Sequence, residues 1–277
     1  MTVPTLRLNN GNDIPQLGFG VFQIPPDEVI EPVGAAIEAG YRLIDTAALY
    51  GNEEGVGKAL ANSGVPRDEL FVTTKLGNPD QGYDAALRAF DASLDKLGLD
   101  YVDLYLIHWP TPKRDLYVET WRAFEKIYAD GRAKAIGVSN FQTNHLNRLF
   151  AETDIIPALN QIELHPGLPQ VELREFHAEH QVVTEAWSPI GQGQGLLDAP
   201  DLTAIAERVG KTPAQVVLRW HIQHGIVAIP KSANPSRIRE NFAVFDFELS
   251  ADDMATLDDV GSGNDRIGPD PDTFNGA

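Results

Sequence analysis

The stretch YRLIDTAALYGNEEGVG, residues 41–57, contains the alternation that decides the fold. An apolar run reads as a short strand that ends near Asp45, and Tyr50 follows in a polar loop. Glu53 and Glu54 then open a helix, where the positive end of the helix dipole stabilises negative charge. The stretch therefore predicts a strand, a loop and a helix in succession.

The same unit recurs along the whole chain. The predicted strands are residues 16–22, 41–46, 70–76, 101–108, 133–139, 157–163, 181–187 and 225–231. Segments such as residues 83–98 lie between them, with apolar residues at three- and four-residue spacing typical of amphipathic helices. Eight such units over about 250 residues predict an α/β fold, a closed (β/α)8 TIM barrel. We expect residues 1–277 to form a single domain, with an N-terminal β-hairpin turning at residues 10–12.

Composition excludes several classes of protein. The 277 residues are 43 % hydrophobic, enough for a sizeable core, and contain no cysteine, which excludes disulfides, thiolate metal sites and cysteine nucleophiles. The formal net charge of -18 argues against a general nucleic-acid or anionic-membrane surface. Neither a membrane-spanning apolar run nor a secretory signal pattern is present, so we expect a cytoplasmic protein.

Barrel enzymes place their chemistry on the loops that leave the C-terminal ends of the strands. The polar and aromatic residues at these ends are Asp45, Lys75, His108, Ser139, Asn140, Gln161, Trp187, Ser188, Lys231 and Ser232. A barrel would bring the first three of these, together with Tyr50, into one mouth. Each alone has an ordinary structural explanation, such as helix capping or packing at the rim, but their joint occurrence is specific.

These four residues have a chemical logic. A tyrosine gives up its proton poorly at neutral pH, and a neighbouring Lys75 ammonium would favour the phenolate of Tyr50. Asp45 would keep Lys75 charged, and His108 would orient a carbonyl oxygen. Tyr50 could then act as a general acid in carbonyl reduction, with the hydride coming from a cofactor.

The motifs resemble those of the aldo-keto reductases. The resemblance lies in LIDTAALYGNEEGVG, TTKL, YVDLYLIHWP, IGVSNF, NQIELHP and PKS, and it covers residues 5 to 250 in the right order. GNDIPQLGFGVFQIPP and RWHIQHGIVAIPKS are most similar to the bacterial 2,5-diketo-D-gluconate reductase branch. By this resemblance Asp45, Tyr50, Lys75 and His108 form the family's catalytic tetrad.

The resemblance also implies NADPH/NADP+ as cofactor, bound without the G-x-G-x-x-G turn of a Rossmann fold. Ser139, Asn140 and Gln161 match residues that hold the carboxamide of the nicotinamide, and Trp187 matches the aromatic residue that stacks on its ring. The loop that would cover the pyrophosphate adds Ser188, Ile190 and Gly191. Lys231, Ser232 and Arg237 match the site of the adenosine 2′-phosphate, and Glu240 and Asn241 match residues that reach the adenine. Lys231, Arg237 and Arg239 also form a basic cluster in an acidic chain.

The expected substrate is a small carbonyl compound: an aldehyde, a ketone or a keto-sugar. Phe22 and Trp109 are predicted to line its pocket, with the C-terminal segment, residues 261–277, as a loop over the active site. Many relatives have an aromatic residue where this chain has Gly77, which predicts a wider pocket. The family resemblance further implies a monomer.

Two alternatives stay open at this point. Lys75 could form a Schiff base in a lyase, or the chain could be a cofactor-binding regulatory protein without turnover. The histidine pairs at residues 177/180 and 221/224 lack accompanying ligands, so we expect no metal site. Glu185 shares strand parity with Trp187, and we expect a paired structural carboxylate there rather than a second acid.

Overall fold

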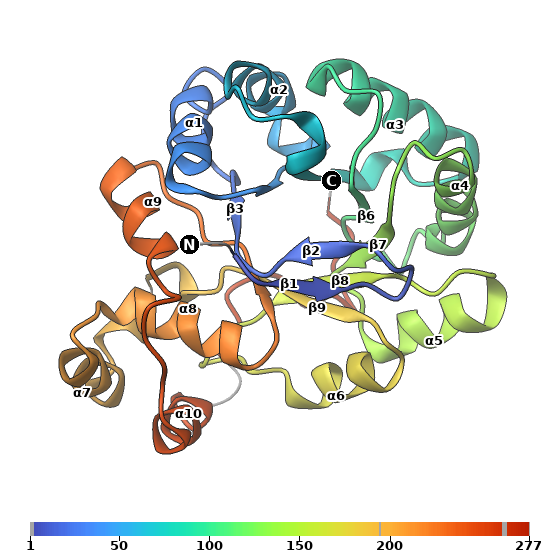
Figure 1. Cartoon of the computed structure of the whole chain (residues 1–277). Coiled ribbons are helices and arrows are strands. Elements are labelled where there is room, and N and C mark those ends of the chain that lie inside the picture. Colours follow the sequence, from blue (N-terminus) through green and yellow to red (C-terminus); the bar gives the residue numbers. More distant parts are fainter. Residues whose placement is uncertain (1–2, 194, 262–264, 277) are drawn as a thin grey trace.

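The computed structural model describes residues 3–193, 195–261 and 265–276, and it confirms the predicted barrel. Eight parallel strands form one sheet in the order β10-β9-β8-β7-β6-β5-β4-β3, and helices surround it (Figure 1). The strands are β3 (Gly18–Gly20), β4 (Leu43–Asp45), β5 (Phe71–Leu76), β6 (Leu104–Ile107), β7 (Ile136–Ser139), β8 (Leu159–Glu163), β9 (Val183–Trp187) and β10 (Val227–Ala228). Each lies inside one of the eight predicted strands.

The sheet closes between its first and last strands. Leu17 forms a parallel bridge with Ala228, whose N–H donates to the Gln16 carbonyl at 3.0 Å. The Gly20 N–H donates to the Pro230 carbonyl at 3.1 Å. Closure removes the free sheet edges and directs all the strand ends into one ring.

The predicted hairpin is present as β1 (Thr5–Arg7) and β2 (Asp13–Pro15), which pair antiparallel. Gly11 has a φ of 89°, a left-handed conformation that glycine adopts without strain. The hairpin lies across one end of the barrel (Figure 1). Its buried Leu8 and Ile14 pack against the apolar residues inside the barrel, so it closes that end.

The helices cover the outside of the barrel. They are α1 (Ile30–Ala39), α2 (Glu53–Asn62), α3 (Tyr83–Leu97), α4 (Tyr117–Ala129), α5 (Thr143–Glu152), α6 (Val171–Glu179), α7 (Pro200–Val209), α8 (Pro213–Gln223), α9 (Pro235–Phe242) and α10 (Ala251–Asp258). Short 3-10 turns occur as η1 (Ala48–Tyr50), η2 (Arg67–Glu69), η3 (Asn78–Asp80), η4 (Gly191–Gly193) and η5 (Leu196–Asp198). Among the described residues, each helix is too short or too polar to traverse a lipid bilayer.

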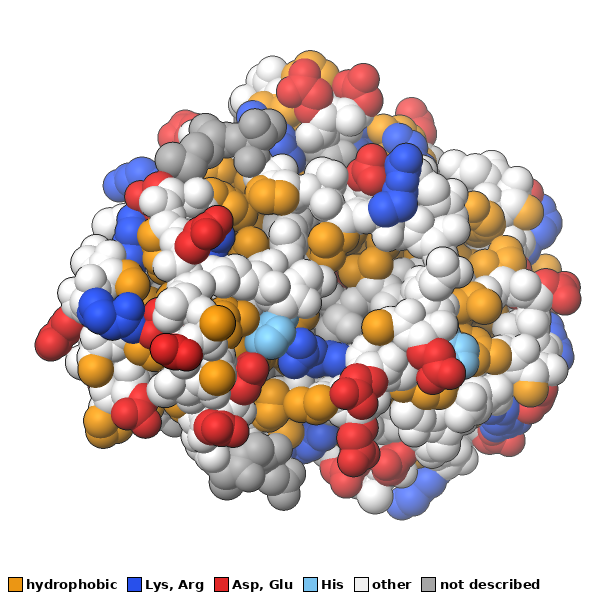
Figure 2. Space-filling view, turned by 60° about the horizontal axis from the view of Figure 1, so that its bottom comes forward, with side chains coloured by type: hydrophobic (Ala, Val, Ile, Leu, Met, Phe, Trp, Pro, Cys, Tyr) orange, Lys and Arg blue, Asp and Glu red, His pale blue; other side chains and the backbone are white. Residues whose placement is uncertain are grey.

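The barrel interior changes from apolar to polar along the strands. Leu43, Leu159 and Val183 belong to the apolar layer beside the hairpin. Side chains on a strand alternate between its two faces, so the next inward residues, two positions later, are Asp45, Gln161 and Glu185. The polar layer therefore lies toward the C-terminal ends of the strands. On the outer face shown in Figure 2, acidic side chains are interspersed with lysine and arginine.

The close packing of α2 against α3 gives a stability prediction. A Cβ on Gly57 would lie 2.2 Å from the carbonyl oxygen of Leu97, whereas a Cβ on the helical Gly34 would meet nothing within 4 Å. We expect Gly57→Ala to lower the free energy of unfolding by about 1–3 kcal/mol, because backbone atoms must move. Gly34→Ala is the matched control and should raise it by about 0.5–1 kcal/mol. Urea denaturation measures both, and equal effects of the two substitutions would contradict the packing described.

Candidate active site

The barrel mouth brings an ammonium group to three oxygen acceptors. Lys75 Nζ lies 2.6 Å from Asp45 Oδ1, 2.9 Å from the Thr46 carbonyl oxygen and 3.2 Å from the Tyr50 hydroxyl oxygen. Lys75 is fully buried, and Asp45 is 1 % exposed. An ammonium has three N–H donors, so these three contacts satisfy all of them.

The turn after β4 places Tyr50 beside Lys75. β4 ends at Asp45, and the chain turns through η1 before α2 begins at Glu53. Buried Asn52 holds the turn: its Nδ2 donates to the carbonyl oxygens of Val21 and Ile24 at 3.0 and 3.1 Å, and its Oδ1 accepts from the Thr46 hydroxyl at 2.9 Å. Asn52 thus joins the loop after β4 to the loop after β3.

Burial and mutual charge together set the pKa values of these groups. Burial by itself would lower the pKa of Lys75, but Asp45 and Tyr50 outweigh it and raise that pKa, so the amine stays charged. Burial raises the pKa of Asp45 against the opposing effects of Lys75 and Gln161. Burial also raises the pKa of Tyr50 and outweighs the lowering effect of Lys75. Lys75 thus favours the phenolate, as expected, but burial gives the larger effect, and the phenol keeps its proton at neutral pH.

His108 lies beside Tyr50, with their ring centroids 5.7 Å apart. Burial, and then the charge of Lys75, hold the pKa of His108 well below its usual range, so the imidazole is neutral. Its buried Nδ1 has no hydrogen-bond partner among the described residues. An unpaired acceptor is tolerated more readily than an unpaired N–H, which favours the tautomer with the proton on Nε2. The imidazole can then donate from Nε2.

Aromatic side chains border the mouth, as predicted for the substrate pocket. Phe22 is 49 % exposed and contacts Tyr50, with ring centroids 5.0 Å apart. Trp109 packs against Phe274 of the C-terminal segment at 4.5 Å. At Gly77, an added Cβ would meet Leu49 at 3.5 Å, and also a carboxylate oxygen of Asp80. The wider pocket expected from Gly77 stays a prediction.

The C-terminal segment is fastened across the strand ends at several points. The buried Glu163 carboxylate accepts the backbone N–H groups of Ile267 and Gly268 at 2.6 and 2.9 Å. Farther along, the Gly276 carbonyl oxygen accepts from Asn78 Nδ2 at 3.0 Å. Residues 262–264 and 277 of this segment lie outside the described residues. The described part agrees with the expected loop over the active site.

The residues matched to the nicotinamide carboxamide lie together at the ends of β7 and β8. Asn140 uses its side chain internally: Nδ2 donates to the His108 carbonyl and to Ser139 Oγ, and Oδ1 accepts from Trp187 Nε1 at 2.7 Å. Ser139 Oγ also donates to the Gln161 carbonyl at 2.9 Å. A carboxamide that donated to Asn140 Oδ1 would take the place of the hydrogen bond from Trp187 Nε1.

The loop after β9 contains the next predicted cofactor residues. Ser188 has a φ of 49°, and its carbonyl accepts the Gly191 N–H at 2.9 Å, so the loop turns back sharply. Ile190 is partly buried and Gly191 is buried. Gln194, within the predicted pyrophosphate loop, lies outside the described residues.

The predicted 2′-phosphate site lies between β10 and the start of α9. Lys231 and Arg237 are exposed, and neither forms an ion pair or side-chain hydrogen bond among the described residues. Two unpaired cations in a chain of net charge -18 fit a phosphate group. Ser232 lies beside them, whereas Glu240 accepts from the Thr212 hydroxyl at 2.9 Å and Asn241 is buried. The latter two therefore also serve the packing of α9 on α8.

Sequence reasoning missed two residues of the mouth, Leu49 and Glu163, and did not single out Phe274 within the expected C-terminal loop. Glu163 had a usable signal, because it shares strand parity with Gln161 and so points to the same side of β8. Leu49 had none, since its position depends on how the turn after β4 folds over the strand ends.

Glu185 is fully buried inside the barrel, and its partner is the side-chain amide of Gln161. Gln161 Nε2 donates to its Oε2 at 2.9 Å, and its Oε1 has no partner among the described residues. Burial and then the charge of Asp45 raise the pKa of Glu185 to about 8. No group of three or more histidine, aspartate or glutamate residues in the described part of the chain is arranged to hold a metal ion.

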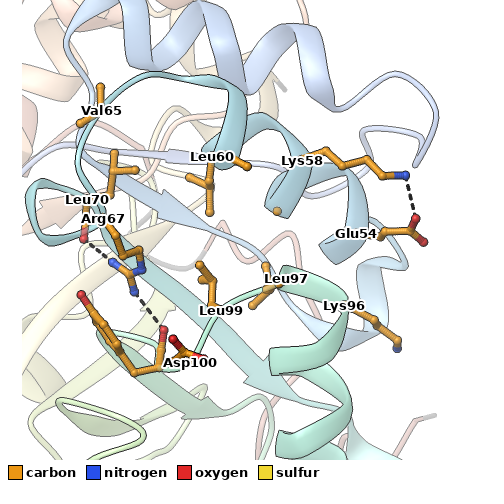
Figure 3. Close-up of a pocket in the computed structure, with 14 residues that line it drawn as sticks. Glu54, Lys58, Leu60, Val65, Arg67, Leu70, Lys96, Leu97, Leu99 and Asp100 are labelled. Atoms are coloured by element: carbon orange, nitrogen blue, oxygen red, sulfur yellow. Dashed lines mark hydrogen bonds and ion pairs between the residues drawn. The ribbon is translucent and has the colours of Figure 1, made fainter.

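A separate groove of about 530 Å³ lies on the outer surface between α2 and α3 (Figure 3). Leucine and valine side chains line it, and two of its cations are already paired: Lys58 with Glu54 at 2.7 Å, and Arg67 with Asp103 at 2.7 Å. It contains none of the strand-end residues. The chemistry therefore belongs to the barrel mouth.

The chain is similar to known proteins over nearly its whole length. A model of the aldo/keto reductase family matches residues 16–262. The glyoxal reductase of Bacillus subtilis strain 168 is 54 % identical over 269 residues, 97 % of this chain and 96 % of that protein. The methylglyoxal reductase DkgA of Escherichia coli K12 is 51 % identical over 278 residues, the full length of both. A crystal structure of a Gox0644 mutant in complex with NADPH has a TM-score of 0.95 and 47 % identity, over 99 % of each chain.

The titration of Glu185 gives a pH prediction. In the unfolded chain a glutamate ionises near pH 4.3, whereas the folded chain holds this proton until about pH 8. The folded state thus binds more protons between these values, so the free energy of unfolding falls as pH rises, by at most about 1.4 kcal/mol per unit. Glutamine does not titrate, so the free energy of unfolding of Glu185→Gln should not fall in this way. The variant should therefore become more stable than the parent as the pH approaches 8.

Urea denaturation from pH 5 to pH 8 measures the effect. Glu53→Gln, at a buried glutamate outside the barrel interior, is the matched control. A stability difference between Glu185→Gln and the parent that does not change with pH would contradict the assignment.

Proposed function

This chain belongs to the aldo/keto reductase family and is an NADP-dependent enzyme that reduces aldehydes and ketones with NADPH. We propose that Tyr50 is the general acid of this reaction. The observation that carries this proposal is the contact of the Tyr50 hydroxyl with the buried Lys75 ammonium at 3.2 Å. A protonated phenol beside a fixed cation is suited to give its proton to an oxygen that gains negative charge.

The four residues divide the work. As the carbonyl oxygen becomes negative, Tyr50 donates its proton to that oxygen, and Lys75 stabilises the phenolate that remains. Asp45 keeps Lys75 charged and directed, and neutral His108 donates from Nε2 to the same oxygen, which orients it. In the oxidation of an alcohol the same phenolate would accept the proton.

NADPH, when bound, supplies the hydride for the carbonyl carbon. We propose that Lys231, Ser232 and Arg237 hold its 2′-phosphate and that Glu240 and Asn241 reach its adenine. Ser188, Ile190 and Gly191 would line the path of the pyrophosphate. Ser139, Asn140, Gln161 and Trp187 would then bind and orient the nicotinamide.

For substrates, we propose small dicarbonyl compounds such as glyoxal and methylglyoxal. Two relatives above 50 % identity, a glyoxal reductase and a methylglyoxal reductase, support this choice. The partly open mouth between Phe22 and Trp109 also suits small carbonyl compounds, because flat aromatic walls exclude water around the reacting group.

Lys75 is a poor candidate for a Schiff-base nucleophile. A nucleophilic amine must be neutral, whereas Asp45 and Tyr50 keep this one charged despite its burial. We propose its role as electrostatic only.

We further propose that residues 1–277 act as one domain, and as a cytoplasmic monomer. The single closed barrel supports the first part. Light scattering after gel filtration should give a mass near 30.3 kDa, and twice that mass would contradict the monomer.

The general-acid assignment predicts the behaviour of Tyr50→Phe. We expect kcat for reduction of methylglyoxal to fall by about 100-fold to 10,000-fold, because the proton donor is lost and the ring is retained. NADPH binding should stay unchanged. An NADPH oxidation assay and a fluorescence titration measure the two quantities, and a variant with the parent kcat would refute Tyr50 as the acid.

The 2′-phosphate assignment predicts a change in cofactor choice. Arg237→Met should weaken NADPH binding by about 10-fold to 100-fold, the value of a charge-assisted hydrogen bond, and leave NADH binding unchanged. Arg88→Met, at another exposed arginine without a partner among the described residues, is the control. Equal losses for NADPH and NADH would place Arg237 away from the phosphate.

A further inference from the structure

Glu185 is a buried carboxyl group that the proposed reaction does not use. It is fully buried on β9, directly opposite Gln161 on β8, and it forms no ion pair among the described residues. Removing a carboxyl group from water without a cation costs free energy. Such a group inside a polar layer at the mouth calls for a functional explanation.

The contacts of Gln161 supply this explanation. Its side-chain nitrogen has two N–H groups, and one points to Asp45 Oδ2 at 2.8 Å while the other points to Glu185 Oε2 at 2.9 Å. A reversed amide would place its oxygen against the Asp45 carboxylate. The Asp45 carboxylate therefore selects one orientation of the Gln161 amide, and Glu185 Oε2 accepts the second N–H of that orientation.

This orientation leaves the amide oxygen of Gln161 free. It accepts no hydrogen bond from the described residues and is not among their fully enclosed unpaired atoms. The backbone carbonyl of Gln161 accepts from the Ser139 hydroxyl and from the Asn140 N–H, both at 2.9 Å. Gln161 thus lies in contact with Ser139 and Asn140, which we also assign to the nicotinamide.

We propose that Glu185 is a positioning residue: by accepting one N–H of Gln161, it keeps the Gln161 amide oxygen turned toward the nicotinamide carboxamide. This inference rests on the proposed function and deepens it. With Asp45 as the sole acceptor, the amide would lose one of its two anchors, and one N–H would be left buried without a partner. Cofactor binding would weaken at its nicotinamide end alone.

The test compares NADPH with 2′,5′-ADP, which lacks the nicotinamide. Glu185→Leu should weaken NADPH binding by about 10-fold, because an N–H of Gln161 loses its acceptor, and should leave 2′,5′-ADP binding unchanged. Glu185→Gln offers an amide oxygen as acceptor and should keep the parent Kd for both ligands. Fluorescence or calorimetric titration gives these constants without turnover.

Glu53→Leu is the matched control, because Glu53 is equally buried but lies at the start of α2, where it accepts from the Thr74 hydroxyl. Glu53→Leu should not change the Kd for NADPH relative to the Kd for 2′,5′-ADP. Unchanged NADPH binding in Glu185→Leu, or an equal loss of 2′,5′-ADP binding, would overturn the positioning role. Should the parent chain bind NADPH and reduce no carbonyl compound, the proposed reaction fails, and these binding constants still decide the role of Glu185.

Discussion

The ammonium of Lys75 is the group on which the rest of the site depends. A buried charge without partners is prohibitively costly, and breaking a buried ion pair by removing one partner costs about 3–5 kcal/mol. Here Asp45, the Thr46 carbonyl and Tyr50 satisfy its three donors. Because those acceptors belong to β4 and to the turn after it, the charge of Lys75 also holds the turn that presents Tyr50.

The barrel separates stability from chemistry along its axis. At one end, Leu8 and Ile14 of the hairpin close an apolar layer that excludes water. Farther along the strands, the interior becomes a layer that includes Asp45, Lys75 and Gln161. The apolar layer keeps the polar one dry on its inner side, which strengthens every electrostatic contact at the mouth.

Two features of the site go beyond its four central residues. Glu163 fastens the C-terminal segment through two backbone N–H groups, and Phe274 of that segment then packs on Trp109. Glu185 joins Asp45 in holding the amide of Gln161. The Gln161 amide inside the mouth and the C-terminal segment over it are therefore both held by buried carboxyl groups. Hydrogen bonds from amide N–H groups offset the free-energy cost of burying these carboxyl groups.

The sequence by itself determined the eight strand and helix units, the hairpin turn and the residue types at the strand ends. These follow from local periodicity and from the side on which barrel strands end. Only the tertiary structure decided which atoms meet, since Asp45 and Gln161 lie 116 positions apart and touch because the sheet closes. It also decided the direction in which the pKa of Tyr50 shifts, because the degree of burial, which outweighs the effect of Lys75, is a property of the assembled mouth rather than of any segment.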